Sequence, residues 1–132
     1  MLSGGCFCGT VRYEVHGETF HSTLCHCSDC RRVAGAPAVA WFSVAVPGFR
    51  ITSGVLRKFR SSAAVERGFC GDCGTALTYQ HAGFAAEIDV TSCSLDAPGE
   101  MAPEDHTWVS EGLRWVKLAA GLPAYDEARA AT

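Results

Sequence analysis

Three cysteines stand within six consecutive positions of the sequence, and such a group can bind a metal ion. They are Cys25, Cys27 and Cys30, in the segment LCHCSDC. Three thiolates fill three of the four positions that zinc prefers, and an open fourth position is typical of catalytic zinc. The spacing therefore predicts a zinc site that leaves room for water or for a substrate thiol.

Two other residues are candidates for the fourth ligand of this site. His26 lies between Cys25 and Cys27. If both cysteines face a metal ion from an extended segment, the His26 side chain points away from it. Cys93 stands alone in TSCSLD and would close the site, but an isolated cysteine is more often a small core residue. We therefore expect neither residue to be a ligand.

Arg31 and Arg32 follow this cysteine triad directly. Their charges would offset the negative charge of zinc bound to three thiolates, or attract an anionic substrate or co-substrate. The alternative is that both are solvated surface residues, which is common for arginine. Four further basic residues would join them only if the fold brings them near: Arg57, Lys58, Arg60 and Arg67.

Two cysteine pairs predict a second, closed zinc site. Cys70 and Cys73 lie in FCGDCG, a C-x-x-C-G metal knuckle in which glycine permits the tight turn. Cys6 and Cys8 are two residues apart, so both point to one face of an extended strand. We predict that these four cysteines bind one structural zinc ion. The alternative is a redox-active C-x-x-C, but no βαβ pattern surrounds it.

The sequence holds eight cysteines, and the expected cellular compartment indicates whether they form disulfides or bind metal ions. Its first residues show no basic segment followed by an apolar run, so we expect no secretory signal and a cytoplasmic location. Thiols stay reduced there, which favours metal binding over disulfides. The longest apolar stretch, 33–49, is interrupted by Pro37 and Pro47 and is shorter than the roughly 20 residues that span a bilayer, so no membrane contact is expected.

Length and charge indicate one domain without a nucleic-acid partner. The chain has 132 residues and 48% hydrophobic content, which suits a single core over residues 1–125. Residues 126–132 offer little to bury and are expected to fray. The net charge of -3, with acids and bases interspersed, is unlike the basic face of nucleic-acid-binding proteins. The oligomeric state is not indicated.

Short runs between glycines and prolines have the pattern of half-buried strands. In 10–16, Val11, Tyr13 and Val15 alternate with polar residues. Further short strands are expected at 38–46, 49–54, 55–60, 64–69, 76–80 and 84–90.

One segment, 28–35, has the signals of a short helix. Ser28 or Asp29 would cap its start, and Gly35 would end it. No segment shows a long apolar period of 3.6 residues. We therefore expect a mainly β domain with short helices.

Five segments follow one another in the order of a known family: GGCFCGTVRYEV, CHCSDCRRVAGAP, SGVLRKFRSS, FCGDCGTALTY and HTWVSEGLRWVKLAAGLPAY. Over roughly residues 3–125 the chain resembles the glutathione-dependent formaldehyde-activating enzyme (GFA)/centromere protein V family. The resemblance implies an Mss4-like (β-tent) zinc-binding fold and two zinc ions per chain. It implies the structural ligands Cys6, Cys8, Cys70 and Cys73 and the catalytic ligands Cys25, Cys27 and Cys30. Phe7 stands where some members have a non-ligating His.

The resemblance also implies a reaction. Family chemistry is the condensation of glutathione with formaldehyde to S-hydroxymethylglutathione, or the reverse carbon–sulfur cleavage. It implies a zinc-dependent carbon–sulfur lyase with a small-molecule thiol, glutathione, as co-substrate, and an open three-thiolate zinc suits this chemistry. One alternative is a lyase acting on another thiol adduct. Another is a non-enzymatic zinc-stabilised binding domain, but the basic extension expected of such a domain is missing here.

The segment HTWVSEGLRW matches a C-terminal pattern of the same family. It contains His106, Trp108 and Trp115. We expect these aromatic side chains to pack against the sheet rather than contact a substrate.

Overall fold

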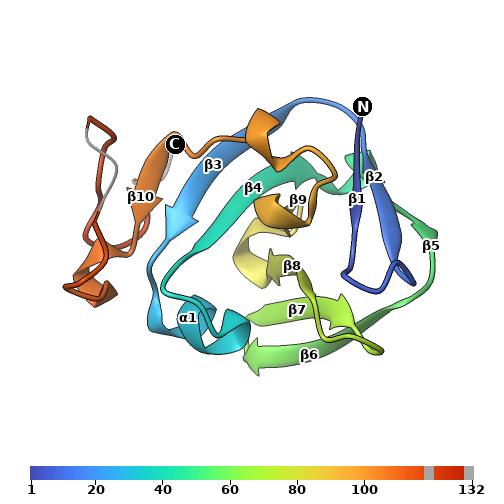
Figure 1. Cartoon of the computed structure of the whole chain (residues 1–132), viewed down its shortest axis with the longest axis horizontal. Coiled ribbons are helices and arrows are strands. Elements are labelled where there is room, and N and C mark those ends of the chain that lie inside the picture. Colours follow the sequence, from blue (N-terminus) through green and yellow to red (C-terminus); the bar gives the residue numbers. More distant parts are fainter. Residues whose placement is uncertain (118–120, 130–132) are drawn as a thin grey trace.

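The computed structural model describes residues 1–117 and 121–129 of the chain, which form a mainly β structure with one short α-helix (Figure 1). The strands in chain order are β1 (Leu2–Gly5), β2 (Arg12–Val15), β3 (Thr19–Cys25), β4 (Val39–Ala45), β5 (Phe49–Ser53), β6 (Leu56–Ser62), β7 (Val65–Cys70), β8 (Ala76–His81), β9 (Glu87–Thr91) and β10 (Asp105–Thr107). The helix α1 spans Ser28–Ala34. Single 3-10 turns lie at Val46–Gly48, Ala82–Phe84, Ser92–Ser94, Pro98–Glu100 and Val109–Glu111.

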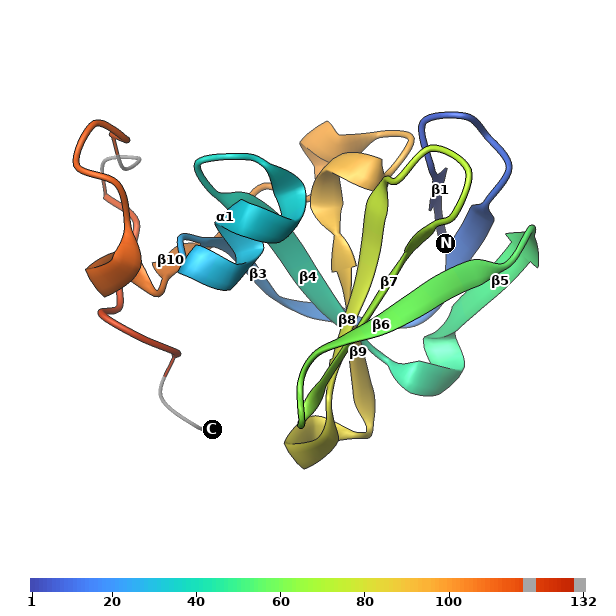
Figure 2. The ribbon, with the colours of Figure 1, turned by 90° about the horizontal axis from the view of Figure 1, so that it is seen from below.

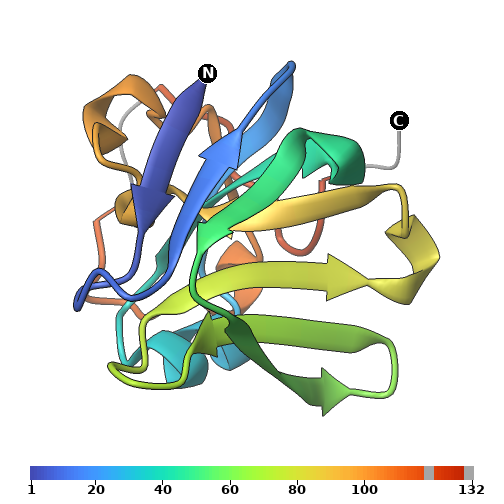
Figure 3. The same cartoon turned by 90° about the vertical axis from the view of Figure 1, so that its right-hand side faces the viewer.

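The strands form two sheets. The smaller sheet has the order β1-β2-β5, and the larger one has the order β10-β3-β4-β9-β8-β7-β6. All pairings are antiparallel except that of β10 with β3. The small sheet and β10 lie at opposite ends of the molecule (Figures 1 and 2), and Figure 3 shows the small sheet from its own side. Helix α1 lies near β4, close to the end of β3 (Figure 2).

The main core lies where the small sheet packs on the large one. Val11, Tyr13 and Val15 are buried, as the alternation around β2 predicts. They join Phe42 of β4 and Leu77 of β8, which are fully buried, in one cluster. Two of the predicted metal ligands, Cys6 and Cys70, belong to the same cluster, so the closed cysteine group sits at the edge of the core.

The predicted mainly β fold of the Mss4-like type is confirmed, and each strand expected from the sequence overlaps a strand of the structure. Three strands, β1, β3 and β10, were not predicted. In β3 the pairing with β4 shifts between Phe20 and Thr23, and His21 has a φ of 53°. This irregularity breaks the period of two that reveals a strand.

The predicted helix at 28–35 is confirmed, with one correction at its start. Gly35 ends it in the left-handed conformation, with a φ of 61°. The N-cap is Cys27, not Ser28 or Asp29, because its sulfur accepts a hydrogen bond from the Cys30 backbone N–H at 3.2 Å. The thiol of a predicted metal ligand therefore takes the role usually filled by an oxygen.

Part of the C-terminal segment is tied to β10. The backbone N–H of Trp108 donates to the carbonyl of Glu127 at 2.8 Å, and the Arg129 guanidinium pairs with Asp105. Residues 130–132 lie outside the described residues, so fraying of 126–132 stays a prediction, as does the single domain over 1–125. In the described part of the chain, no helix is both long and apolar enough to cross a membrane.

Candidate metal centres

The four cysteines of the closed cluster come together from two distant parts of the chain. The sulfurs of Cys6, Cys8, Cys70 and Cys73 all lie within 4.8 Å of one another. The Sγ–Sγ distance is 3.6 Å between Cys6 and Cys8 and 3.8 Å between Cys8 and Cys70. A tetrahedral zinc ion with bonds of about 2.3 Å holds its sulfurs about 3.8 Å apart. The donor set and its spacing therefore fit zinc.

Backbone N–H groups point at the buried sulfurs of this cluster. Val11 donates to Cys6 Sγ at 3.2 Å, and Asp72 donates to Cys70 Sγ at 3.4 Å. In the knuckle that holds Cys70 and Cys73, the backbone N–H of Gly74 donates to the Cys70 carbonyl at 2.8 Å, and Gly74 has a φ of 82°. Such N–H groups stabilise thiolates, which are the form that binds a metal ion.

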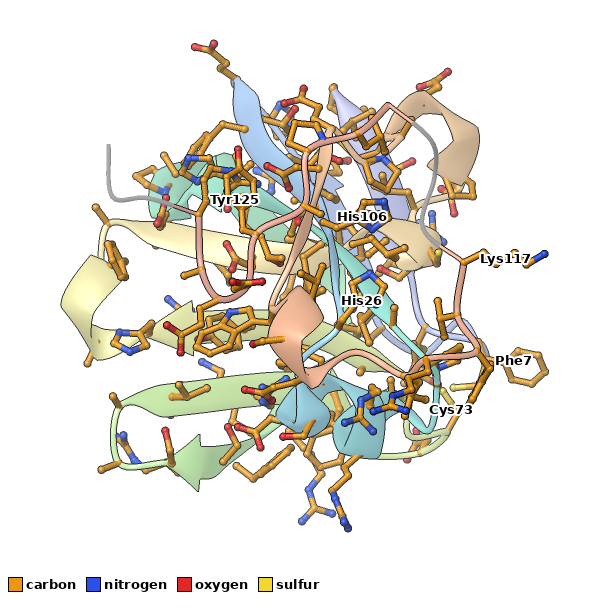
Figure 4. All side chains as sticks on the ribbon, turned by 90° about the vertical axis from the view of Figure 1, so that its left-hand side faces the viewer. Phe7, His26, Cys73, His106, Lys117 and Tyr125 are labelled. Carbon is orange, nitrogen blue, oxygen red and sulfur yellow. The ribbon has the colours of Figure 1, made fainter. Side chains whose placement is uncertain are left out.

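Thr75 links the two halves of the cluster. Its hydroxyl lies 3.3 Å from Cys73 Sγ and accepts from the Phe7 backbone N–H at 3.1 Å. The bond to Thr75 is the main cause that lowers the pKa of Cys73 to about 5. The Phe7 side chain points into solvent beside Cys73 and is 93% exposed (Figure 4).

The triad is built at the junction of β3 and α1. Cys25 is the last residue of β3, Cys27 caps α1, and Cys30 lies in its first turn. Their sulfurs lie within 4.8 Å of one another, and the group contains no fourth Cys, His, Asp or Glu from the described residues. Cys25 and Cys30 are buried, while Cys27 is half-buried. Three soft donors with this spacing also fit zinc.

The thiols of the triad differ in pKa. Hydrogen bonding from Cys25 lowers the pKa of Cys27, and the same contact raises the pKa of Cys25. The half-buried Cys27 is therefore the sulfur that carries negative charge first.

A cavity of about 280 Å³ opens onto the triad. Three aromatic side chains form part of its wall: Trp41, Tyr79 and Trp108. Four charged side chains line it as well: Asp29, Arg67, Asp89 and Glu111. Arg67 is the one basic side chain among the described residues of this lining.

Arg67 comes from β7 and is buried, with 4% of its surface exposed. Its Nη1 lies 4.0 Å from Cys30 Sγ, and its Nε donates to Ser61 Oγ at 3.0 Å. Its guanidinium lies over the Tyr79 ring, 5.0 Å from the centroid. The sequence carries a signal for this position, because Val65 and Arg67 fall on one face of the predicted strand 64–69, and Val65 is also buried.

The predicted substrate-binding arginines lie elsewhere. Arg31 donates to the backbone carbonyls of His26 at 3.4 Å and Glu111 at 3.1 Å. Arg32 is exposed, and neither arginine lines the triad cavity. Their role in binding a substrate stays a prediction. The other basic residues of the sequence pattern, Arg57, Lys58 and Arg60, lie on β6, the exposed edge strand of the large sheet.

His26 turns away from the triad toward His106. Their rings point toward each other in Figure 4, with 3.1 Å between His26 Nε2 and His106 Nδ1. Both are 1% exposed, and His106 Nε2 has no hydrogen-bond partner in the described part of the chain. Burial lowers the pKa of His26. His26 and Cys93 both stand outside the two cysteine groups, and Cys93 is exposed.

The segment after β10 covers the triad. Trp108, with a φ of 57°, packs against the buried cluster of Cys25, Cys30 and Trp41 and also lines the cavity. Trp115 is 71% exposed and does not line it. The strained backbone at Trp108 therefore turns one tryptophan of this segment toward the cysteines.

Glu111 fixes the same segment to the start of α1. Its Oε1 accepts from the Ser28 backbone N–H at 2.8 Å and from Ser28 Oγ at 2.9 Å. Because Ser28 opens the helix that carries Cys30, this bond ties the cover of the cavity to one of the triad cysteines.

A second cavity of about 800 Å³ adjoins the first and shares its lining residues Thr23, Trp41, Tyr79 and Asp89. Glu87 and Asp89 line it, and burial raises the pKa of Asp89 to about 6. Its lining includes Arg129, which is already paired with Asp105. The larger cavity is thus richer in carboxylates than in free cations.

The fold and the cysteine groups define a class of protein: a mainly β structure with one four-cysteine group and one three-cysteine group, each of which could hold a metal ion. Comparison with known proteins gives the family. The model of the family described as glutathione-dependent formaldehyde-activating enzyme matches residues 1–111, and the chain belongs to this family.

Two relatives agree with this membership, and one solved structure shares the fold. A protein of Halomonas elongata named putative glutathione-dependent formaldehyde-activating enzyme is 27% identical over 129 residues, which cover 89% of this chain and 81% of that one. A protein of Schizosaccharomyces pombe named uncharacterized lyase is 31% identical over 78 residues, 59% of this chain; the match spans 56% of that protein. A crystal structure of a Rhodobacter sphaeroides protein shares the fold, with a TM-score of 0.59, 23% identity, and coverage of 94% of this chain and 99% of that one.

Proposed function

We propose that this protein is a zinc-dependent carbon–sulfur lyase-type enzyme that makes or cleaves the adduct of a thiol and an aldehyde. Glutathione and formaldehyde, giving S-hydroxymethylglutathione, are the first substrates to test, in keeping with the family name. The protein would work in the reducing cytoplasm, where free thiols persist.

The observation that best supports this function is the three-cysteine group that lines a cavity. Cys25, Cys27 and Cys30 place three sulfurs together, and the group takes no fourth ligand from the described residues. A zinc ion held there would supply an open position that favours a substrate sulfur in its thiolate form. The closed cluster has no such position, so we assign it a structural role.

The protein's own side chains would position the substrate. Trp41 and Trp108 line the cavity and pack against the triad, so they would shield one side of the reacting sulfur from water. At about 280 Å³ this cavity suits a thiol and a small aldehyde. The rest of a larger thiol substrate would extend past Tyr79 into the adjoining cavity of about 800 Å³.

A second candidate is a lyase that acts on a thiol adduct other than that of glutathione. Glutathione carries two carboxylates, whereas Glu87 and Asp89 line the adjoining cavity and its Arg129 is paired with Asp105. Like charges oppose binding there. This lining favours a thiol with fewer carboxylates, while the family name favours glutathione.

A thiol panel would test the proposal. The zinc-loaded protein is incubated with glutathione, cysteine, cysteamine or 2-mercaptoethanol, with and without formaldehyde, and adduct formation is followed by NMR. Cobalt-substituted protein is titrated with each thiol, because cobalt reports a new sulfur ligand in its absorption spectrum. Accelerated adduct formation with a matching spectral change supports the enzyme. No acceleration and no spectral change with any thiol would point to a zinc-stabilised binding domain instead.

A further inference from the structure

Arg67 is a buried cation that lacks a carboxylate partner. It is 4% exposed, and within the described residues no Asp or Glu forms an ion pair with it. Its neighbour in the sequence, Glu66, pairs with Lys58 instead. A guanidinium taken out of water is unfavourable unless an anion lies beside it. The thiolates and a bound anion are the partners that the cavity offers.

Two contacts hold the guanidinium in one orientation. Nε donates to Ser61 Oγ at 3.0 Å, and the guanidinium carbon Cζ lies 5.0 Å from the centroid of the Tyr79 ring. Nη1 then faces the triad, 4.0 Å from Cys30 Sγ. A donor fixed before the reaction needs no reorganisation when charge develops, which is the basis of electrostatic catalysis.

The other charged side chains of the cavity are all acidic, so Arg67 is its one side-chain cation among the described residues. Asp29, Asp89 and Glu111 line it together with the three thiols, and no other Lys or Arg of the described residues does. Negative charge that forms on a substrate oxygen in this cavity therefore has one fixed side-chain cation to contact. Arg31, which follows the triad in the sequence, is engaged with backbone carbonyls instead.

We propose that Arg67 binds the oxyanion that forms on the aldehyde, an inference that rests on the proposed function. As the thiolate adds, a sulfur electron pair forms the carbon–sulfur bond, and the carbonyl π pair moves onto oxygen. The resulting alkoxide accepts hydrogen bonds from the Arg67 guanidinium and then takes a proton from water. In the reverse reaction the hydroxyl proton returns to water, the oxygen pair restores the carbonyl, and the sulfur leaves with the bonding pair.

Two small thiols separate oxyanion binding from sulfur binding. Mercaptoacetate carries a carboxylate two carbons from sulfur, close to where the alkoxide would form, and 2-mercaptoethanol has a neutral hydroxyl there. We would titrate both into the cobalt-substituted wild type, Arg67→Gln and Arg67→Lys, and follow the cobalt spectrum. Arg57→Gln is the control, because Arg57 lies on the neighbouring exposed strand β6 and does not line the cavity.

Wild type and the control should bind mercaptoacetate about tenfold or more tightly than 2-mercaptoethanol, since a hydrogen bond to a charged group is worth that much. In Arg67→Gln this preference should disappear, while the affinity for 2-mercaptoethanol changes less than about twofold. Arg67→Lys should keep part of the preference, because lysine retains the charge but not the planar fork. With the true thiol and aldehyde, Arg67→Gln should lower kcat about 100-fold with little change in the thiol KM.

Three results would overturn the inference. If the wild type responds to both thiols without a preference, Arg67 does not bind the oxyanion, although the proposed function stands. If Arg67→Gln loses cobalt from the triad and Arg67→Lys keeps it, Arg67 balances the charge of the metal–thiolate group instead. If no thiol alters the spectrum of the wild type, the proposed function itself fails.

Discussion

The sulfurs of Cys8 and Cys70 lie 3.8 Å apart although 62 residues separate them in the sequence. This contact joins the turn after β1 to the last residue of β7, so it links the N-terminal strand to the middle of the chain. An ion bound there closes a long loop, and its binding free energy adds to the free energy of folding. The two cysteine groups should therefore differ in what their loss does to stability.

Cys70→Ser should lower the free energy of unfolding by more than about 3 kcal/mol, because it opens the closed cluster at the edge of the core. Cys27→Ser should cost less, since Cys27 is half-buried and outside the main core cluster. Denaturant unfolding of the zinc-loaded proteins measures both values. If the Cys27 variant is the less stable one, the structural and catalytic assignments are reversed.

Metal analysis should give two zinc ions per chain. Cys93→Ser should retain both, because Cys93 lies outside the two cysteine groups. Cys6→Ser should lose one ion and Cys25→Ser the other, in each case by removing one of the sulfurs that hold it. Elemental analysis after gel filtration is the measurement. A wild type with one tightly bound ion, or loss of zinc from Cys93→Ser, would contradict this ligand assignment.

Asp89 should make stability depend on pH. Burial raises its pKa to about 6, from an unfolded value near about 4, so folding disfavours the ionised form. Its contribution is most favourable below pH 4 and is lost as pH rises toward 6. Asp89→Asn, which can still accept from Ser43, should therefore be more stable than wild type at pH 7.5 by roughly 1–3 kcal/mol.

The gain of Asp89→Asn should shrink as the pH is lowered from 7.5 to 5. Urea unfolding with excess zinc at both values measures this. The matched control is Glu18→Gln, which removes an exposed carboxylate. A difference between Asp89→Asn and wild type that stays constant over this range would show that Asp89 ionises as freely in the folded protein as in the unfolded one.

The sequence predicts the cysteine groups of the candidate site but not the cavity beside them. Both cysteine groups could be predicted, because C-x-C and C-x-x-C spacings are local and keep the sulfurs close together. The expected extended strand at Cys6 and Cys8 is wrong, since β1 ends at Gly5 and Cys8 lies in the turn that follows. The cavity above the triad could not, because its walls come from strands and turns distant in sequence. Trp41 lies on β4, Tyr79 on β8 and Trp108 after β10. Only tertiary pairing brings them together.

The arginines show the same limit. Adjacency in the sequence favoured Arg31 and Arg32, but α1 directs Arg31 toward the carbonyls of His26 and Glu111. Arg67 is 37 residues from Cys30 in the sequence, and its position on β7 places its guanidinium beside the triad. Its alternation with Val65 indicates a buried face, but the hydrophobic pattern alone does not say what that face meets.

Trp108 should report thiol binding through its fluorescence. It packs against Cys25 and Cys30 and lines the cavity, whereas Trp115 is exposed and does not. A thiol entering the cavity should quench or shift the emission of the zinc-loaded protein. The change should be retained in Trp115→Phe and reduced by at least about half in Trp108→Phe, with Trp41 supplying the remainder. An equal loss in both variants would mean that the thiol binds elsewhere.

Glu111 should control how firmly the triad holds its metal. Its carboxylate accepts two hydrogen bonds from Ser28, at the start of the helix that carries Cys30. Glu111→Ala leaves the half-buried Ser28 N–H without this partner and frees the segment that carries Trp108, so the triad loses preorganisation. We expect about a tenfold or larger fall in cobalt affinity at the triad, within the range seen when groups that orient metal ligands are removed.

Cobalt affinity at the closed cluster should not change in Glu111→Ala, because Glu111 makes no described contact there. Competition with a chelator, followed in the absorption spectrum, separates the two sites. Glu100→Ala is the control, since Glu100 is an exposed acid in a different turn. Ser28→Ala should give a smaller loss than Glu111→Ala, because the backbone N–H of residue 28 can still donate to Glu111. If both sites weaken together, Glu111 acts on the stability of the whole domain and not on the triad.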